Sequence, residues 1–196
     1  MKTISYLTLF LLINLPLFAQ TITVGSGGDY ATLEDVGPDL VAGDTVIILN
    51  GVYSDGSQFL ENVNGTEAAP IVIKAATLHE AVFQGGTEAI HLIDCSYIII
   101  DGLVIEQQTG NGINIDDGGD YSTPAHHITI MNCLFRDMNV SGNRDLLKLS
   151  GLDDFLIKNC QFIDGSGGGS GIDMVGCHHG VIEDCFFDNA GTGWLG

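Results

Sequence analysis

The sequence predicts an all-β solenoid, in which short strands wind into stacked coils, and two observations support this fold class. First, four segments fit one template of an apolar strand, a turn residue and a second apolar strand. Second, a third strand with alternating apolar residues precedes each template, so that a coil has three strands. The turn residues are Gly102, Asn132, Asn159 and Asp184, which lie 30, 27 and 25 residues apart. This spacing is typical of stacked solenoid coils.

The strand before each template has apolar residues at every second position, as in Ile113-Asn-Ile115. Successive side chains of a strand point to opposite faces, so the apolar residues face the interior and the middle residue points outwards. Coils stacked about 4.8 Å apart would align the middle residues in one exposed row. We call this row the ladder, and it consists of His91, Asn114, Lys148 and Asp173. We predict that function lies along it.

The same alternation predicts what fills the interior. Residues such as Ile128, Ile130 and Phe162 should stack on their equivalents in the neighbouring coils. The turn residues Asn132 and Asn159 are predicted to bond to the backbone of the next rung, as a structural column. The inward-facing cysteines Cys133, Cys160 and Cys185 are expected to act as small apolar residues, without a disulfide that the fold requires.

Nearly all of the chain after residue 20 resembles the right-handed parallel β-helix of the pectin lyase-like superfamily. The opening coils, Gly43-Asp-Thr-Val-Ile-Ile-Leu-Asn-Gly-Val-Tyr53 and Gly65-Thr-Glu-Ala-Ala-Pro-Ile-Val-Ile-Lys-Ala75, are similar to those of polysaccharide lyase family 6, the chondroitinase B and alginate lyase type. The resemblance implies a right-handed β-helix and a lyase-like activity on an acidic polysaccharide. The same opening occurs in β-helix proteins of other or no known activity, so it indicates fold more strongly than reaction. The catalytic and calcium-binding residues of family 6 lie in later coils and have no match here.

Two terminal regions complete the predicted organisation. Residues 1–20 have a basic start, an apolar run and a small residue at Ala19, which is the layout of a cleavable signal peptide; an uncleaved anchor is the alternative. Residues 21–196 would then form one exported β-helix domain, extracellular or periplasmic, with no membrane span. A short helix within residues 31–41, interrupted near Gly37-Pro38, is predicted to cover the first coil. Residues 193–196 align with residues 171–174, so the chain is expected to stop inside a coil, as a fragment of a longer protein.

The charge balance narrows the partners. The chain has 25 acidic and 6 basic residues and a net charge of −19. Nucleic-acid binding requires basic surface, so we expect no nucleic-acid partner. An acidic polysaccharide would need a cation to bridge it to this surface. The simpler interpretation is that the acidic faces keep an exported, monomeric protein soluble.

Two acidic groups are candidates for calcium, which binds six to eight oxygen atoms. One is the glycine-containing segment with Asp116, Asp117 and Asp120; an ordinary exposed acidic loop is the alternative. The other combines Asp145, just before the strand of Lys148, with Asp173 one rung along. The spacing of the first group is not that of an EF-hand or a glycine-rich calcium repeat, and the positions of the second group are more suggestive.

The resemblance to pectate-lyase-type β-helices implies roles for the same residues. Asp145, Asp173 and Asn114 could hold a cation or a sugar hydroxyl, and Lys148 or Arg144 could be the basic partner. Elimination from a uronate needs a cation beside the carboxylate and a base for the C5 proton. An ion pair with no part in chemistry is an equal interpretation of Lys148.

Three other interpretations stay open. Asp145 and Asp173 could instead hydrolyse a glycosidic bond as paired carboxylates. The histidine doublets at 126–127 and 178–179, with Asp153-Asp154 between them, could bind a transition metal or be solvated turn residues. We expect His91, Asn114, His178 and His179 to contact substrate. The non-enzymatic alternative is an adhesion or scaffold module, for which the repeat supplies only a rigid body.

Overall fold

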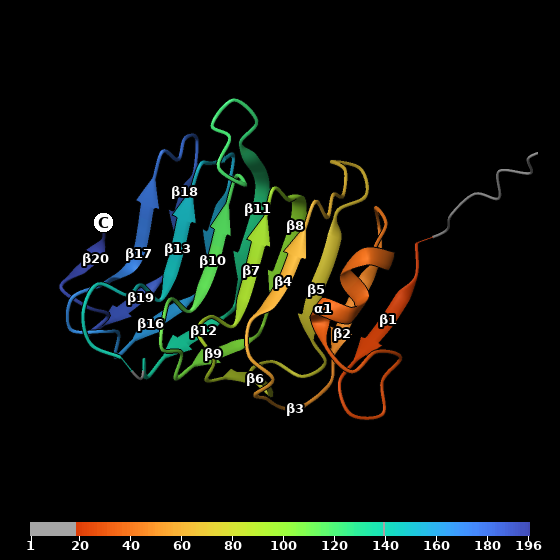
Figure 1. Ribbon diagram of the computed structural model, residues 1–196, viewed down its shortest axis with the longest axis horizontal. Coiled ribbons are helices and arrows are strands. Elements are labelled where there is room, and N and C mark those ends of the chain that lie inside the picture. Colours follow the sequence, from red (N-terminus) through yellow and green to blue (C-terminus); the bar gives the residue numbers. More distant parts are fainter. Residues whose placement is uncertain (1–18, 139) are drawn as a thin grey trace, which may run out of the picture.

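The computed structural model describes residues 19–138 and 140–196, which form a solenoid of about six coils (Figure 1). The strands of successive coils form three sheets of eight, six and six strands, and every pair of neighbouring strands is parallel. The predicted fold class and the three-strand coil are therefore confirmed. The predicted signal peptide falls mainly on residues 1–18, which lie outside the described residues.

We name the sheets A, B and C in the order in which the chain enters them. Sheet A contains β1 (Thr21–Val24), β2 (Thr45–Ile48), β5 (Ile71–Ala75), β8 (Ser96–Asp101), β11 (Ala125–Met131), β14 (Leu152–Asp153), β15 (Leu156–Lys158) and β18 (Val181–Glu183). Sheet B contains β3 (Gly51–Tyr53), β6 (Ala81–Gln84), β9 (Val104–Glu106), β12 (Leu134–Arg136), β16 (Gln161–Ile163) and β19 (Phe186–Asp188). Sheet C contains β4 (Gln58–Glu61), β7 (Ile90–Ile93), β10 (Ile113–Asp116), β13 (Leu147–Ser150), β17 (Ser170–Val175) and β20 (Gly193–Leu195).

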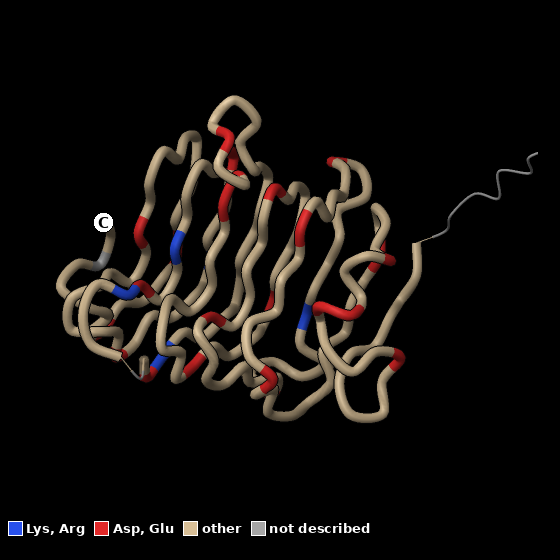
Figure 2. The backbone as a smooth tube through the Cα atoms, in the orientation of Figure 1, with Lys and Arg blue, Asp and Glu red and all other residues tan. Residues whose placement is uncertain are grey.

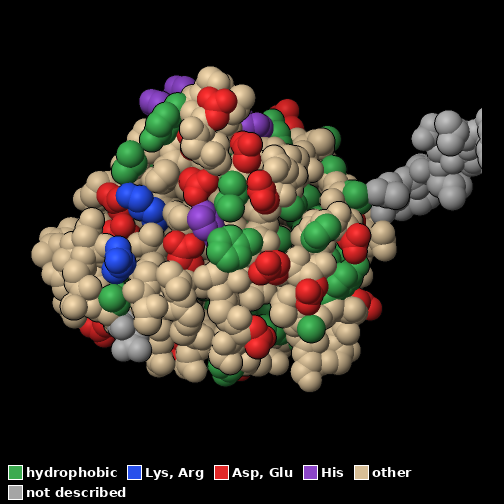
Figure 3. Space-filling model, in the orientation of Figure 1, with side chains coloured by type: hydrophobic (Ala, Val, Ile, Leu, Met, Phe, Trp, Pro, Cys, Tyr) green, Lys and Arg blue, Asp and Glu red, His purple; other side chains and the backbone are tan. Residues whose placement is uncertain are grey.

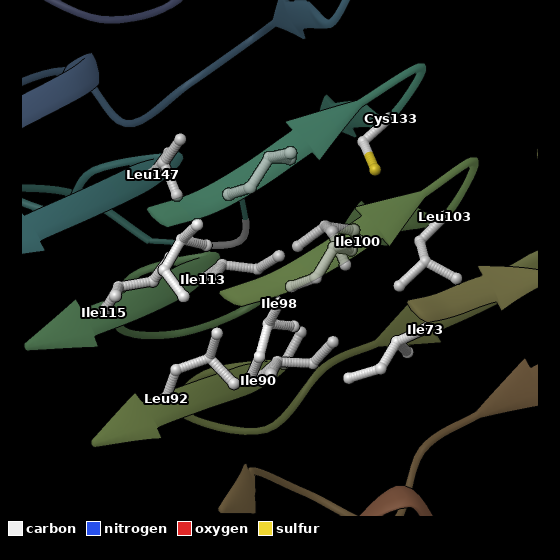
Figure 4. Close-up of a cluster of buried hydrophobic side chains, with 14 of the residues drawn as sticks. Ile73, Ile90, Leu92, Ile98, Ile100, Leu103, Ile113, Ile115, Cys133 and Leu147 are labelled. Carbon is white, nitrogen blue, oxygen red and sulfur yellow. The ribbon is translucent and has the colours of Figure 1, made fainter. Parts of the chain in front are cut away.

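The interior is a set of apolar columns that run across the coils (Figure 4). Ile90, Ile113 and Leu147 pair in register on successive strands of sheet C, and all three are fully buried. Phe162 stacks between Phe135 and Phe187, with ring centroids 4.9 Å apart on both sides. Burial of such side chains contributes about 1.5–3 kcal/mol each, so these columns supply much of the free energy that stabilises the fold.

The predicted turn residues all adopt the left-handed conformation. Their φ angles are 77° at Gly102, 54° at Asn132, 52° at Asn159 and 55° at Asp184. Glycine, asparagine and aspartate tolerate this conformation better than other residues do. Asn159 Nδ2 donates to Asn132 Oδ1, and Asn132 Nδ2 donates to Asp101 Oδ1, each at 2.7 Å. The structural column is confirmed, but its side chains bond to one another and not to the backbone as predicted.

The N-terminal cap is shorter than predicted. Helix α1 (Leu33–Val36) begins at Thr32, whose hydroxyl accepts from the Asp35 backbone while the Asp35 carboxylate accepts from the Thr32 backbone. A 3₁₀ helix, η1 (Gly37–Asp39), follows because Pro38 can begin a new helical turn but cannot continue the first one. Both helices contact β4, so they cover the first strand of sheet C, and Leu33 and Val36 are buried there.

At the other end, the predicted alignment of residues 193–196 was wrong by one residue. Strand β20 pairs Gly193 with Ser170 and Leu195 with Ile172. A slip of one residue exchanges the two faces of a strand, so sequence alignment of a short glycine-rich segment does not fix which residue faces inwards. Among the described residues, no helix is long and apolar enough to cross a membrane.

Candidate functional site

The strand register of sheet C confirms the ladder as a row of neighbours. His91 pairs with Asn114, Asn114 with Lys148, and Lys148 with Asp173. The row begins one rung earlier than predicted, because Phe59 on β4 pairs with His91. Figure 3 shows this face of the molecule, where basic side chains gather over β13 and β17 and a histidine lies next to hydrophobic side chains nearer β4.

His91 is held between two carboxylates. Its Nδ1 lies 3.0 Å from Glu88 Oε2, and its Nε2 lies 2.6 Å from Asp116 Oδ2. Asn114 Nδ2 lies 3.1 Å from the same Nε2. Burial lowers the pKa of His91, but the hydrogen bonds that its ring donates to Glu88 and Asp116 outweigh this effect, so the pKa is raised. His91 therefore lies between two carboxylates that favour its protonated form.

Lys148 forms an ion pair with Asp173 on the next rung, and both side chains are about one-fifth exposed, at 22% and 21%. This is the ladder ion pair that the sequence suggested for Lys148. Figure 2 shows how sparse basic residues are on a backbone that carries many acidic ones. Arg144 is exposed just before β13, where its Nη1 donates to the Asn143 carbonyl at 3.3 Å.

A groove of about 570 Å³ opens on sheet C beside Lys148. It is formed by residues of β10 and β13 and by the loop that follows β10. The lining residues are Ile93, Asn111, Asn114, Asp116, Asp117, Gly118, Gly119, Tyr121, Lys148 and Ser150. The structure thus brings together four of the predicted site residues, Asn114, Asp116, Asp117 and Lys148, in one depression.

Asp117 is the most enclosed carboxylate of this groove. Its side chain is almost fully buried, with 3% of the residue exposed, and its Oδ1 accepts from the Gly119 backbone at 2.9 Å. Its Oδ2 has no hydrogen-bond partner among the described residues. It lies against Gly151, which has a φ of 63° and where a Cβ atom would collide with the carboxylate. Gly151 is therefore required both by the turn and by the position of Asp117.

Asp145 lies below the surface of the ladder. Only 4% of the residue is exposed, and its Oδ1 accepts from the Ser170 backbone at 2.8 Å. Burial raises the pKa of its carboxyl, the hydrogen bond from Ser170 opposes this, and the charge of Asp173 adds to the increase. Asp145 therefore links its own rung to the next one through the backbone of Ser170.

The predicted calcium ligands are only partly assembled. Asp120 is exposed and bonds within its own turn, where its Oδ1 accepts from the backbone and hydroxyl of Ser122. These bonds, the hydroxyl first, lower the pKa of Asp120. No group of three or more His, Cys, Asp or Glu residues in the described part of the chain is arranged to hold a metal ion. Calcium binding stays a prediction.

The histidine doublets lie along sheet A, away from the ladder. His126 pairs with Asp153 on the next rung, and Asp153 with His178, so the predicted order of histidine, aspartate and histidine is present. His178 Nδ1 lies 2.9 Å from Asp153 Oδ1, and the His179 side chain is 76% exposed. Neither His178 nor His179 is among the described residues that line the groove at Lys148.

Two side chains near the ladder were missed by the sequence analysis. Phe59 occupies the middle position of the strand before the first template, and it could have been found by extending the repeat one coil towards the N-terminus. Tyr121 is 69% exposed and lines the groove. It lies in the acidic loop, of which the sequence analysis considered only the carboxylates. The sequence carries no signal that this loop folds over β13.

The comparisons with known proteins agree with this architecture. Residues 51–195 match the family model of the right handed beta helix region. The chain belongs to the right-handed β-helix family. No functionally curated protein sequence matches it.

Solved structures of several right-handed β-helix proteins are similar to the chain. An alginate lyase from Paenibacillus sp. str. FPU-7 has a TM-score of 0.60 and 18% identity over 86% of this chain and 66% of its own. A mannuronic acid specific family 6 lyase from human gut microbiota has a TM-score of 0.55 and 14% identity over 89% and 51%. Pectate lyase Pel9A has a TM-score of 0.50 and 16% identity over 81% and 47%. The chain thus spans less than two thirds of each of these structures, and the likeness shows the fold.

Proposed function

We propose that this protein is a lyase-like carbohydrate enzyme that binds an acidic polysaccharide along the ladder of sheet C. The observation that carries the proposal is the groove in which Lys148 and Asn114 lie side by side in an otherwise acidic surface. A positive charge and an amide at neighbouring positions can bind the carboxylate and a hydroxyl of one uronate residue. The similarity to solved lyases supports the proposal through the shared fold.

The groove suits β-elimination through electrostatics. Removal of the C5 proton of a uronate by a base places negative charge on the adjacent carboxylate. The C4–O bond then breaks, its electron pair leaves with the oxygen, which takes up a proton, and a C4–C5 double bond remains. Lys148, which is ion-paired with Asp173, would stabilise that charge from the ladder. Tyr121 lies at the same groove, and its phenolic oxygen is our candidate for the group that takes the C5 proton and returns it to the leaving oxygen.

Calcium is part of the proposal as a cofactor that the substrate would help to bind. Asp116 and Asp117 offer too few oxygen atoms for a site of six to eight ligands. The unpartnered Oδ2 of Asp117 is the one observation in the groove that favours a cation. A sugar carboxylate and water would have to supply the remaining oxygen atoms.

Glycoside hydrolysis is the second candidate, and one observation favours it. Burial raises the pKa of Asp145, and the neighbouring Asp173 is ion-paired with Lys148, so the two carboxyl groups lie in different environments. Hydrolases use such a pair as acid and base or nucleophile. Asp145 would have to reach the glycosidic oxygen from its buried position, so elimination is the better supported reaction.

The decisive experiment follows ultraviolet absorbance of the unsaturated product with pectate, alginate and glycosaminoglycans, in calcium and in chelator. Lys148→Ala should abolish product formation. The matched control is Lys158→Ala, because Lys158 also forms an ion pair across rungs, with Glu183 at 2.7 Å, but on sheet A. Equal loss in both variants would contradict a site on the ladder. New reducing ends without unsaturated product would indicate hydrolysis, and neither product would favour the adhesion module.

We also propose that the protein is exported, on the layout of residues 1–20. N-terminal sequencing of the protein recovered outside the cytoplasm should give a chain that starts near residue 20. An unprocessed N-terminus would contradict this.

A further inference from the structure

Phe59 is an exposed aromatic residue in line with the ladder. Strand β4 alternates as expected, with Gln58 and Leu60 buried, and Phe59 is 45% exposed between them. Its backbone pairs with His91, so Phe59 extends the row in which Asn114 and Lys148 follow. An apolar ring on this face has no part in the interior columns.

The ring of Phe59 is held in place by His91. The two ring centroids are 5.4 Å apart with an angle of 38° between the planes. A cation within about 6 Å of an aromatic centroid is attracted to the ring. The raised pKa of His91 favours its charged form, and Glu88 and Asp116 fix the imidazole from both ring nitrogens. Phe59 thus has a neighbour that restrains its ring, and 45% of the residue is still exposed.

The charges around Phe59 indicate which part of a ligand it would contact. The two carboxylates beside His91 outweigh its single charge, and Glu61 on the same strand is exposed. A sugar carboxylate would gain nothing at this position. The C–H groups on one face of a pyranose ring suit the apolar surface of an aromatic side chain, which stacks without needing charge.

We propose that Phe59 is a stacking platform for a sugar ring at the far end of the ladder, outside the groove of Lys148. This rests on the proposed function. Phe59 and Lys148 are three rungs apart, or about 14 Å at about 4.8 Å per rung. A ligand that contacts both must therefore be an oligosaccharide, and the platform sets a preference for chain length and not for charge.

The test measures binding of uronate oligomers, from disaccharides to chains long enough to span the ladder, to the protein and its variants. Phe59→Ala should weaken binding of the long oligomer roughly tenfold, the scale of one aromatic stacking interaction. Disaccharide binding should not change. The loss should be the same at low and high salt, whereas the loss in Lys148→Ala should shrink as salt screens its charge. Phe59→Trp should keep or strengthen the preference for long chains.

Phe186→Ala is the matched control, because Phe186 is also an exposed phenylalanine, 55% exposed, but lies on β19 of sheet B. Equal affinities of Phe59→Ala and the wild type for long oligomers would overturn the platform and leave the proposed function standing. A loss that is as large for the disaccharide would also overturn it. Failure of the wild-type protein to bind or cleave any of these glycans would overturn both.

Discussion

The ladder of sheet C and the turn column at Asn132 both place one residue on each rung, yet the residues of the two rows meet different requirements. The turn column consists of residues that tolerate the left-handed conformation, and Asn159 Nδ2 donates to Asn132 Oδ1 between rungs. The ladder changes residue at every rung, from Phe59 to Asp173, and its side chains are partly exposed. Each position of the turn column must adopt the left-handed conformation, and this requirement recurs in each coil. The ladder positions have no such shared requirement and are free to contact a ligand.

Substitutions in the interior columns should lower the free energy of unfolding more than substitutions in either the turn column or the ladder. Phe162→Ala removes a fully buried ring from between two stacked rings, and we expect it to lower the free energy of unfolding by about 3–5 kcal/mol. Chemical denaturation measures the change. Phe162→Leu serves as the milder control, and a loss below that of Phe162→Leu would show that the column does not stabilise the fold.

The turn column should come second. Asn159→Ala places alanine at a φ of 52° and removes the hydrogen bond to Asn132, so we expect a loss of about 1.5–3 kcal/mol. Asn159→Gly removes the bond but tolerates the conformation, and it should recover part of that loss. Thermal unfolding of the two variants separates the contribution of the hydrogen bond from that of the backbone conformation. Equal stability of both would mean that conformation contributes nothing.

His91 should make the stability of the ladder depend on pH. Its pKa is raised in the folded protein, so its contribution is fully present below the unfolded value of about 6.5 and is lost as pH rises through the folded pKa. The wild type should therefore exceed His91→Gln in stability by more in acid than in base, as measured by denaturation across that range. His178→Gln, at an exposed ion pair, is the control and should change little. The reverse pH trend would contradict the two-carboxylate arrangement.

The smallest effect on stability is expected for Lys148→Met. The ion pair with Asp173 is partly exposed, and such pairs contribute about 0–1 kcal/mol. The variant should unfold close to the wild type while losing activity on the substrate. Circular dichroism during heating provides the check. A large loss of stability would show that Lys148 stabilises the fold, as the turn column does. It would contradict the distinction between the two rows.

Much of the fold could be predicted from the sequence because each coil repeats the same pattern of inward-facing apolar residues and turn residues. The alternation in Ile113-Asn-Ile115 fixes which residues point inwards, and small or asparagine residues mark the left-handed turns. The cap was harder to bound, since Pro38 shortens α1 to one turn and a 3₁₀ helix completes it. The one-residue error at Gly193 arose because a short segment with two glycines has no alternation to read.

The candidate site was predictable only in part. The neighbouring positions of Asn114 and Lys148 follow from the strand register, and both residues line one groove. The enclosure of Asp117 against Gly151 and the approach of Tyr121 depend on how a nonrepeating loop folds over β13, which no periodicity encodes. The pairing of His91 with Asp116 likewise joins residues of neighbouring coils.

The sequence by itself therefore determined the coil, its inward faces and the row along which the ladder lies, because a strand has a period of two and stacked strands keep their register. The tertiary structure decided what that row can do. Burial of Asp145, the contact of His91 with Asp116, and the groove beside Lys148 arise from contacts between coils. Desolvation and charge pairing act over these distances in space, whatever the separation along the chain.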